Sequence, residues 1–321
     1  MKYWLLILFV FLSTYTLKSQ DMPLYSQYLL NQYLINPAIA GINGCSIFQT
    51  TNIMQWTGIK DAPMTNSISY HSGIKNVGLG TLVYKDRNGL NSTLGFQFTF
   101  AYHILIKDDN KDKKRLSFGL SYCGNQYSVD ESAFTPVEND PIVTGNIQSA
   151  YTSNANAGIY FEYNSLFLGL SVANLLPQTN NLNKSILEPV NSRNYFFHTG
   201  YAIGLNKALN FEPSICFKTK GKMDSQLDLN IKTFYKPDKK SHTIWNGLSY
   251  RRSSDNQNIS LSVMVGYIAA RYHFAYAYDL GLTTLQKYNS GTHEITIGFN
   301  FCPNNEKDVH CPVYSNTLKR K

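Results

Sequence analysis

The residues of this sequence that could catalyse a reaction are few, and their spacing does not favour one. Ser69, His71 and Ser72 lie close together, but successive residues of a strand point to opposite faces, so the cluster predicts no triad. A serine–histidine hydrolase is an alternative hypothesis, which predicts a Ser–His pair on the outward face near a rim. His293-Glu294 lacks the second histidine of the H-E-x-x-H zinc motif, and the chain has no glycine-rich phosphate loop. The sequence therefore favours a protein that is not an enzyme and holds no metal or other cofactor.

Alternating polar and apolar residues run through most of the chain. Phe96, Phe98 and Phe100, for example, share one face of a segment whose other face carries Gln97 and Thr99. This period of two is typical of a β-strand with one apolar face, and the 23 tyrosines and 18 phenylalanines add β propensity. About fourteen such segments are expected, near 44–57, 65–72, 77–84, 94–105, 115–127, 153–162, 165–173, 195–205, 208–219, 225–235, 243–251, 257–268, 271–279 and 292–301.

The connections between these segments alternate in length. They are mostly short after even-numbered segments (73–76, 164, 206–207, 236–241, 269–270) and mostly long after odd-numbered ones (85–93, 128–152, 174–194, 280–291), with 107–114 and 221–224 as exceptions. Short turns at one end and long loops at the other are typical of a transmembrane barrel whose short turns face the periplasm. We therefore predict an all-β, monomeric protein, a transmembrane antiparallel β-barrel of about fourteen strands with a short N-terminal plug segment.

The ends of the chain predict export. Residues 1–19 are expected to be a secretory signal peptide, because their apolar run is too short to span a bilayer. A plug or periplasmic segment at 20–43, the outer-membrane barrel at 44–302 and a periplasmic tail at 303–321 would follow. Losing Lys2 and Lys18, and no acid, with the signal peptide lowers the formal charge from +8 to +6. The charged stretch 107–115 mixes both signs, so no nucleic-acid partner is expected.

The stretch 20–41 does not alternate as a strand would. Asn36 followed by Pro37 supplies a helix N-cap and a first helical position, so two short helical turns separated at Asn36 are expected to plug the barrel. The polar strand faces would line the lumen, where charges need partners or water. The predicted lumen residues are Gln97, His103, Asp228, Lys232, Arg271, His273, Asp279 and Glu294.

The five cysteines leave at least one thiol unpaired in an oxidising compartment. The preferred disulfide is Cys302–Cys311, which would close the polar tail between them. The alternative is Cys45–Cys302, because these residues begin the first and end the last expected strand, which are neighbours in a closed barrel. Metal binding by Cys302, His310 and Cys311 is the third option. Cys123 and Cys216 are expected to be packed thiols.

Four motifs carry a resemblance to a known family. The pattern D-x-P-x-Y-S-Q-Y-x-x-N-x-x-x-x-N-P-A-x-A-G at 21–41 resembles the N-terminal signature of the PorP/SprF family, outer-membrane proteins of the type IX secretion and gliding-motility machinery in Bacteroidetes. Three further pieces agree in order, at 55–65, 77–80 and 290–295. The matching residues singled out are Tyr25, Ser26, Gln27, Tyr28, Asn36, Pro37, Ala38, Gly41, Gln55, Trp56, Pro63, Thr65, His293 and Glu294.

The resemblance implies a non-enzymatic component that assists export or cell-surface attachment of large adhesin-like cargo. Its implied partners are one secreted cargo protein, other periplasmic and outer-membrane components of the secretion machine, and outer-membrane lipid. Asn36-Pro37-Ala38 is also similar to the hatch segment of long-chain fatty-acid transporters. The alternative function is therefore a passive channel for hydrophobic small molecules, which predicts a lateral opening where Gly or Pro interrupts a strand and an apolar lumen pocket near the plug.

Overall fold

A computed structural model describes residues 27–108, 113–133, 145–179, 190–206, 208–220, 225–237, 242–254, 259–269 and 271–301. The expected signal peptide, the expected C-terminal tail, Tyr25, Ser26, Cys302 and Cys311 lie outside these residues, and the side chain of Gln27 is not described. Among the described residues, no helix is long and apolar enough to span a membrane.

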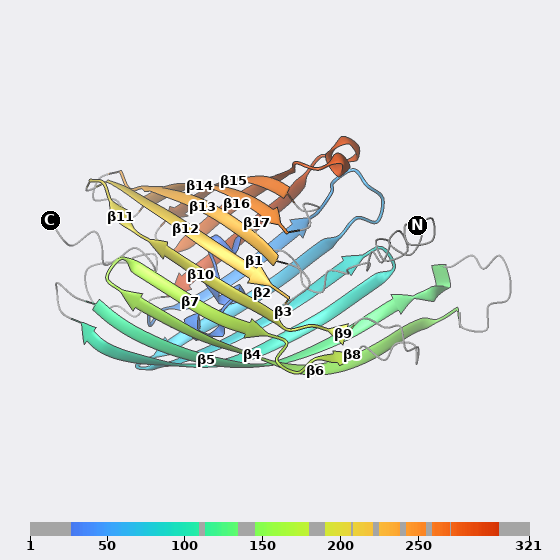
Figure 1. The fold of residues 1–321 in the computed structure, drawn as a ribbon, viewed down its shortest axis with the longest axis horizontal. Helices are drawn as coiled ribbons and strands as arrows, with labels where there is room; N and C mark the ends of the chain where they lie inside the picture. Colours follow the sequence, from blue (N-terminus) through green and yellow to red (C-terminus); the bar gives the residue numbers. More distant parts are fainter. Residues whose placement is uncertain are drawn as a thin grey trace, which may run out of the picture.

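The described chain is dominated by long antiparallel strands (Figure 1). The wall strands are β1 (Ser46–Met54), β2 (Met64–Ile74), β3 (Val77–Asn88), β4 (Asn91–Asp108), β5 (Lys113–Asp130), β6 (Ile147–Tyr163), β7 (Leu166–Ala173), β10 (Asn194–Tyr201), β11 (Ile203–Gly204), β12 (Leu209–Thr219), β13 (Ser225–Tyr235), β14 (His242–Ser253), β15 (Ile259–Ala269), β16 (Tyr272–Gly281) and β17 (Thr292–Phe301). A small separate hairpin is formed by β8 (Gln178–Thr179) and β9 (Val190–Asn191).

Two pairings close the sheet into a barrel. β1 pairs with β17 in a register from Ser46↔Phe301 to Met54↔His293, and β10 pairs with β12. β11 resumes after Ala202 and pairs with the same strand as β10, so the two count as one wall strand. The result is a closed antiparallel barrel of fourteen strands, as predicted.

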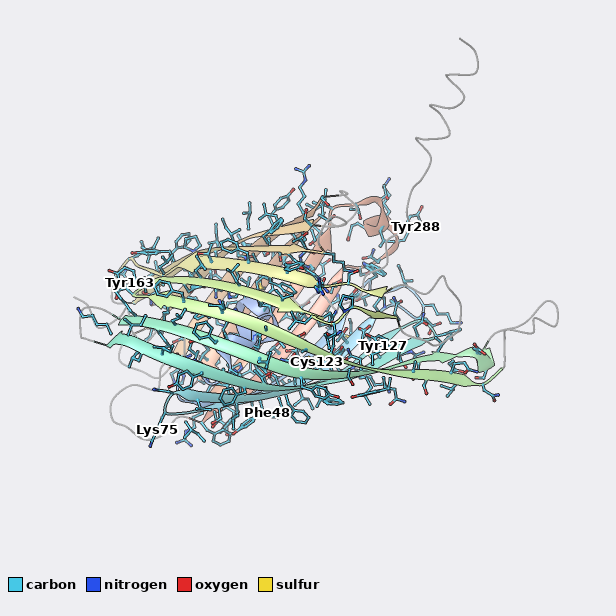
Figure 2. All side chains as sticks on the ribbon, turned by 60° about the horizontal axis from the view of Figure 1, so that its bottom comes forward. Phe48, Lys75, Cys123, Tyr127, Tyr163 and Tyr288 are labelled. Atoms are coloured by element: carbon cyan, nitrogen blue, oxygen red, sulfur yellow. The ribbon has the colours of Figure 1, made fainter. Side chains whose placement is uncertain are left out.

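The strand faces segregate as the alternation predicts. In β13, Leu229 and Ile231 point outward and are 44% and 45% exposed, whereas Asp228 and Lys232 are buried inside. Apolar side chains cover the outer wall in the same way on the other strands (Figure 2). A closed sheet with an apolar outer face satisfies its own backbone hydrogen bonds and suits a lipid environment.

The two ends of the barrel differ. One, here the short-turn end, carries the connections 75–76, 109–112, 164–165, 205–208, 236–241 and 270–271. The other, the long-loop end, carries 55–63, 89–90, 131–146, 174–193, 220–224, 254–258 and 282–291. Figure 2 shows Lys75 and Tyr163 at the short-turn end and Tyr288 at the long-loop end.

One predicted long loop is wrong. β3 and β4 continue through most of 85–93 and pair up to Asn88↔Asn91, leaving a tight turn at Gly89 and Leu90. Gly89 has a φ of +62°, which favours glycine and permits the turn. The polar residues that predicted a loop here instead extend the hairpin.

Candidate functional site

A plug formed by residues 27–44 fills part of the lumen and is the blue segment inside the barrel in Figure 1. It consists of three 3₁₀ helices, η1 (Gln27–Leu29), η2 (Gln32–Leu34) and η3 (Pro37–Ile39), rather than the two turns predicted. The predicted break at Asn36 is confirmed. The Asn36 Oδ1 accepts a hydrogen bond from the Ala38 N–H at 3.0 Å, and Pro37 occupies the first helical position.

The plug runs from the middle of the lumen toward the short-turn end. Its first residues contact β13, where Tyr28 lies beside Asp228. Its last residues reach the short-turn rim, where the Gly41 N–H donates to His71 Nδ1 at 3.1 Å and the Arg115 guanidinium donates to the Ile42 carbonyl. The chain then enters β1 directly.

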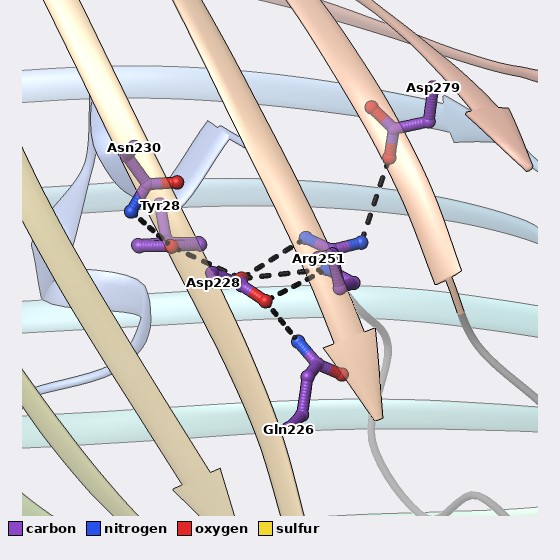
Figure 3. A network of polar contacts seen from close by, with 6 residues as sticks. All are labelled: Tyr28, Gln226, Asp228, Asn230, Arg251 and Asp279. Atoms are coloured by element: carbon purple, nitrogen blue, oxygen red, sulfur yellow. Dashed lines mark hydrogen bonds and ion pairs between the residues drawn. The ribbon is translucent and has the colours of Figure 1, made fainter. Parts of the chain in front are cut away.

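A buried polar network holds the start of the plug (Figure 3). The Tyr28 hydroxyl donates to Asp228 Oδ2 at 3.1 Å and accepts from Asn230 Nδ2 at 3.0 Å. Arg251 pairs with both Asp228, at 3.3 Å, and Asp279, at 3.7 Å. Burial, reinforced by the charge of Asp228, raises the pKa of Tyr28 well above its ordinary value. The tyrosine therefore acts as a neutral hydrogen-bonding anchor.

A buried ion pair supports the same side of the plug. The Lys232 Nζ lies 2.7 Å from Glu212 Oε1 and donates to the Leu29 carbonyl at 2.8 Å. The β12–β13 register places Glu212 directly opposite Lys232, and both side chains are almost completely buried. The pair therefore links two wall strands to the plug backbone.

Tyr33 anchors the middle of the plug to the opposite wall. Its hydroxyl lies 2.8 Å from Thr99 Oγ1 and accepts from Gln97 Nε2 at 3.4 Å. The side chain is 1% exposed. Burial raises the pKa of Tyr33 from its ordinary value of 10.0 to about 12.

This shift predicts an alkaline loss of stability. Between pH 10 and about 12 the folded protein keeps the Tyr33 proton that the unfolded chain releases. The contribution of this shift to the free energy of unfolding is therefore complete below pH 10 and falls by about 3 kcal/mol as the pH rises toward 12. Tyr33→Phe should flatten the decline in the unfolding midpoint of the detergent-solubilised barrel over this range. The control Tyr288→Phe changes an exposed tyrosine and should leave the decline of the unfolding midpoint with pH unchanged. If the midpoint declines equally in both variants, the raised pKa of Tyr33 is not its cause.

Two residues of the sequence cluster, Ser69 and His71, hold the plug, whereas Ser72 is hydrogen-bonded to Ser46 of β1. Ser69 accepts a hydrogen bond from Asn31 Nδ2 at 3.0 Å, and His71 binds the Gly41 N–H. A hydrogen-bonded Ser–His pair does occur, since Ser117 Oγ lies 2.8 Å from His103 Nδ1. However, Ser117 is fully buried, and His103 Nε2 is 2.9 Å from the Ala40 carbonyl. This pair lies beneath the plug, not on the outward face that the hydrolase hypothesis requires.

Wall glycines let the plug backbone approach the barrel closely. A Cβ at Gly119 would collide with the Ala38 N and the Pro37 carbonyl carbon, and one at Gly78 would collide with the Ala40 carbonyl. Gly158 receives the Asn36 side chain in the same way. The plug therefore rests on a track without side chains along β3, β5 and β6.

Most predicted lumen residues point inward, and one does not. Those on the inner face are Gln97, His103, Asp228, Lys232, His273, Asp279 and Glu294. The prediction for Arg271 is wrong, because this residue lies in the exposed turn before β16. Arg271 has the numbering parity of the inward-facing residues of β16, but it lies beyond the rim, where water can solvate the guanidinium.

Sequence reasoning missed two functional residues, Arg251 and Glu212. Leu248 and Tyr250 point outward in β14, and their parity could have placed Arg251 inside. Glycine, serine and tryptophan at 245–249 obscured that alternation. In β12, Pro213 obscured the alternation of apolar and polar residues beside Glu212 in the same way.

Two motif segments from opposite ends of the chain meet at the long-loop end. The Thr57 N–H donates to the Gly291 carbonyl at 2.9 Å, and the Ser290 N–H donates to the Thr57 carbonyl at 2.7 Å. The Trp56 N–H also reaches Thr292 Oγ1, at 3.4 Å. These loops border a cavity of about 100 Å³ that is also lined by Arg251 and Asp279. We call it the mouth cavity.

The remaining motif residues of the β1–β2 loop, β2 and β17 make contacts of their own. The Gln55 N–H donates to the Pro63 carbonyl at 2.9 Å, which closes the β1–β2 loop, and Thr65 donates to Asp86. His293 points outward, with Nδ1 2.7 Å from the Tyr276 hydroxyl, whereas Glu294 points into the lumen.

The cysteine predictions are only partly within reach of the described residues. Cys45 is disulfide-bonded, and its partner lies outside those residues. Cys123 and Cys216 are buried free thiols. Because Cys123 and Cys216 are free, the partner of Cys45 is Cys302 or Cys311, so the preferred Cys302–Cys311 pairing is wrong. The β1–β17 register, which begins at Ser46↔Phe301, supports the alternative Cys45–Cys302, which stays a prediction. Within the described part of the chain, no group of three or more His, Cys, Asp or Glu side chains could hold a metal.

Known proteins support the fold and identify the family. The chain is similar to the CymD monoaromatic hydrocarbon channel, with a TM-score of 0.50 at 7% identity over 89% of this chain and 95% of that one. It is also similar to the Ralstonia pickettii toluene transporter TbuX, with a TM-score of 0.47 at 11% identity over 85% and 93% of the two chains. No curated protein matches the sequence at a significant level. The model of the type IX secretion system membrane protein family PorP/SprF matches residues 17–299, and the chain therefore belongs to that family.

Proposed function

We propose that this barrel is a non-enzymatic component of type IX secretion that assists the export or surface attachment of large adhesin-like cargo. In this proposal residues 1–19 direct export, the short-turn end faces the periplasm and the long-loop end faces outward. Periplasmic components of the secretion machine would contact the short-turn end and residues 303–321. The alternation of short turns and longer loops supports this orientation.

The convergence of two family motifs on one mouth carries the proposal. Trp56 and Gly291 lie far apart in the sequence, yet their loops are hydrogen-bonded around the mouth cavity. Below it, the lumen is occupied by a plug with many buried wall contacts. Cargo would therefore bind at the mouth rather than pass through the barrel.

Trp56→Ala tests this proposal. Barrels purified in mild detergent from native outer membranes should bring adhesin-like cargo with them, identified by mass spectrometry. The variant should recover at least about tenfold less cargo, because truncating an aromatic interface anchor costs about 2 kcal/mol or more. Tyr163→Ala removes an exposed aromatic ring at the opposite end and should leave recovery unchanged. If the folded Trp56→Ala barrel recovers as much cargo as the unaltered barrel, the mouth is not the docking site.

A second candidate function has a specific observation in its favour. A small cavity of about 70 Å³ lies between the plug and the wall near the short-turn end. Leu29, Ile39, Phe234 and Trp245 are among its lining residues, so much of its wall is apolar, as the hydrophobic-channel hypothesis predicts. In addition, Pro213 interrupts the β10–β12 ladder beside an apolar groove on the outer wall.

The same purification separates the two functions. Barrels that carry lipid or another hydrophobic molecule, and no cargo, would favour the channel. Barrels that carry cargo would favour the secretion component.

A further inference from the structure

The upper part of β6 has a neighbouring strand on only one side among the described residues. β6 pairs with β5 along its whole length, from Ile147↔Asp130 to Tyr163↔Lys114. It pairs with β7 only over Ala157–Tyr163. The chain after β7 extends this cover a little, since the Leu175 N–H donates to the Ala155 carbonyl and the Asn154 side chain binds Leu176. Residues 147–153 continue beyond it, in the hairpin that projects at the right of Figure 1.

The alternation of a strand identifies the backbone groups at this edge. The N–H and C=O of one residue point to the same side, and those of the next residue point to the other. The Ala155 carbonyl points away from β5, toward Leu175. By parity, the backbone groups of Ser149, Tyr151 and Ser153 point the same way. They form a row of alternating donors and acceptors at the long-loop end.

This edge carries none of the features that usually prevent strand pairing. Natural proteins protect exposed edges with lysine, proline, bulges or inward-pointing charges. Residues 147–153 read I-Q-S-A-Y-T-S, without charge, proline or glycine. The β5–β6 register through this stretch is continuous, without a bulge. The edge therefore stays competent to pair.

The side chains around the edge indicate what kind of strand it would accept. Tyr151 is 56% exposed on the outer face, and its hydroxyl lies 3.2 Å from that of Tyr122. Aromatic residues on a strand favour aromatic or β-branched residues opposite them. An incoming strand of alternating apolar and polar residues fits this surface, because its main chain would bond the β6 backbone groups that no described strand pairs with.

We propose that residues 149–153 of β6 are a strand-addition site for an extended, uncharged segment of the exported cargo. The choice of cargo as the partner rests on the proposed function, which places the long-loop end outside the cell. The site is separate from the mouth cavity. A large cargo protein would thus be held at two places, by a loop surface around Trp56 and by main-chain hydrogen bonds to β6.

Photo-crosslinking in the native outer membrane tests this site. With p-benzoylphenylalanine at position 151, the full-length barrel should crosslink to cargo through an extended, uncharged segment identified by mass spectrometry. Ser149→Pro removes an N–H that faces the open side and is not used in the β5 ladder. It should lower the crosslink yield about tenfold, as for the loss of about one main-chain hydrogen bond. The matched control Ser149→Ala should leave the yield unchanged.

The remaining outcomes are equally definite. Equal yields from the proline and alanine variants, a crosslink to a second barrel, or a crosslink only to the barrel's own chain would overturn the inference. If the Ser149→Pro barrel does not fold, hydrogen exchange at the Tyr151 amide of the unaltered barrel is measured instead. Exchange should slow when cargo is bound, and unchanged exchange would refute pairing. If the β6 test fails while Trp56→Ala still recovers less cargo, the proposed function stands and only the strand-addition site is refuted. If unaltered barrels recover no cargo, both the proposed function and the strand-addition site are refuted.

Discussion

Replacing Lys232 with methionine is expected to destabilise the barrel by about 3–5 kcal/mol, because Glu212 would remain buried without its ion-pair partner. The two side chains lie 2.7 Å apart and are only 2% and 1% exposed. The substitution also removes the hydrogen bond from Lys232 to the Leu29 carbonyl, so both the wall and the plug are destabilised. The shift can be measured as the urea midpoint at which the barrel loses its folded mobility on an unheated denaturing gel.

The double variant Lys232→Met, Glu212→Gln provides the control. It removes both charges, so most of the lost stability should return even though the ion pair is absent. A loss below about 1 kcal/mol in the single variant would contradict the expectation, because it would place the pair in an environment as well solvated as a surface.

Gly119→Ala is expected to open the lumen. The added Cβ would occupy the space of the Ala38 N and the Pro37 carbonyl carbon, which are backbone atoms and cannot rotate away. The end of the plug must then leave the β5 wall, at a cost of about 1–3 kcal/mol in stability. Single-channel recordings in a planar bilayer should show larger and more frequent openings than the unaltered barrel.

Gly204→Ala is the matched control for this permeability change. A Cβ at Gly204 meets only Asn210 Oδ1, at 3.5 Å, and does not approach the plug. This variant should conduct like the unaltered barrel. If Gly119→Ala remains folded and equally closed, the plug has a freedom to shift that its contacts with β3 and β6 do not suggest.

Much of the wall could be predicted because a strand's period depends only on local residue type. The alternation of Leu229 and Ile231 with Asp228 and Lys232 is enough to assign both faces of β13. The position of Asn36 was equally readable, since an N-cap followed by proline is a local signal. These predictions needed no knowledge of distant residues.

The partners across the lumen could not be predicted in this way. The pairing of Glu212 with Lys232 depends on the β12–β13 register, and the contact between Tyr28 and Asp228 joins residues separated by 200 positions. Parity also gives no warning where a strand stops, which is why Arg271 was placed inside although it lies in a turn. Local patterns thus define the surfaces, and the closed geometry decides which side chains meet.

The connection between the plug and β1 has a consequence for how the molecule is assembled. β1 pairs with β17, the last strand of the barrel, so the circle cannot be completed until nearly the whole chain is present. Residues 27–44 directly precede β1 and lie within that circle. The plug is joined to β1 at the short-turn end, so it is either enclosed as the wall closes or drawn into the lumen from that end. A change that loosens the plug, such as Gly119→Ala, leaves the β1–β17 pairing untouched, so the barrel is expected to close and insert with its lumen less filled.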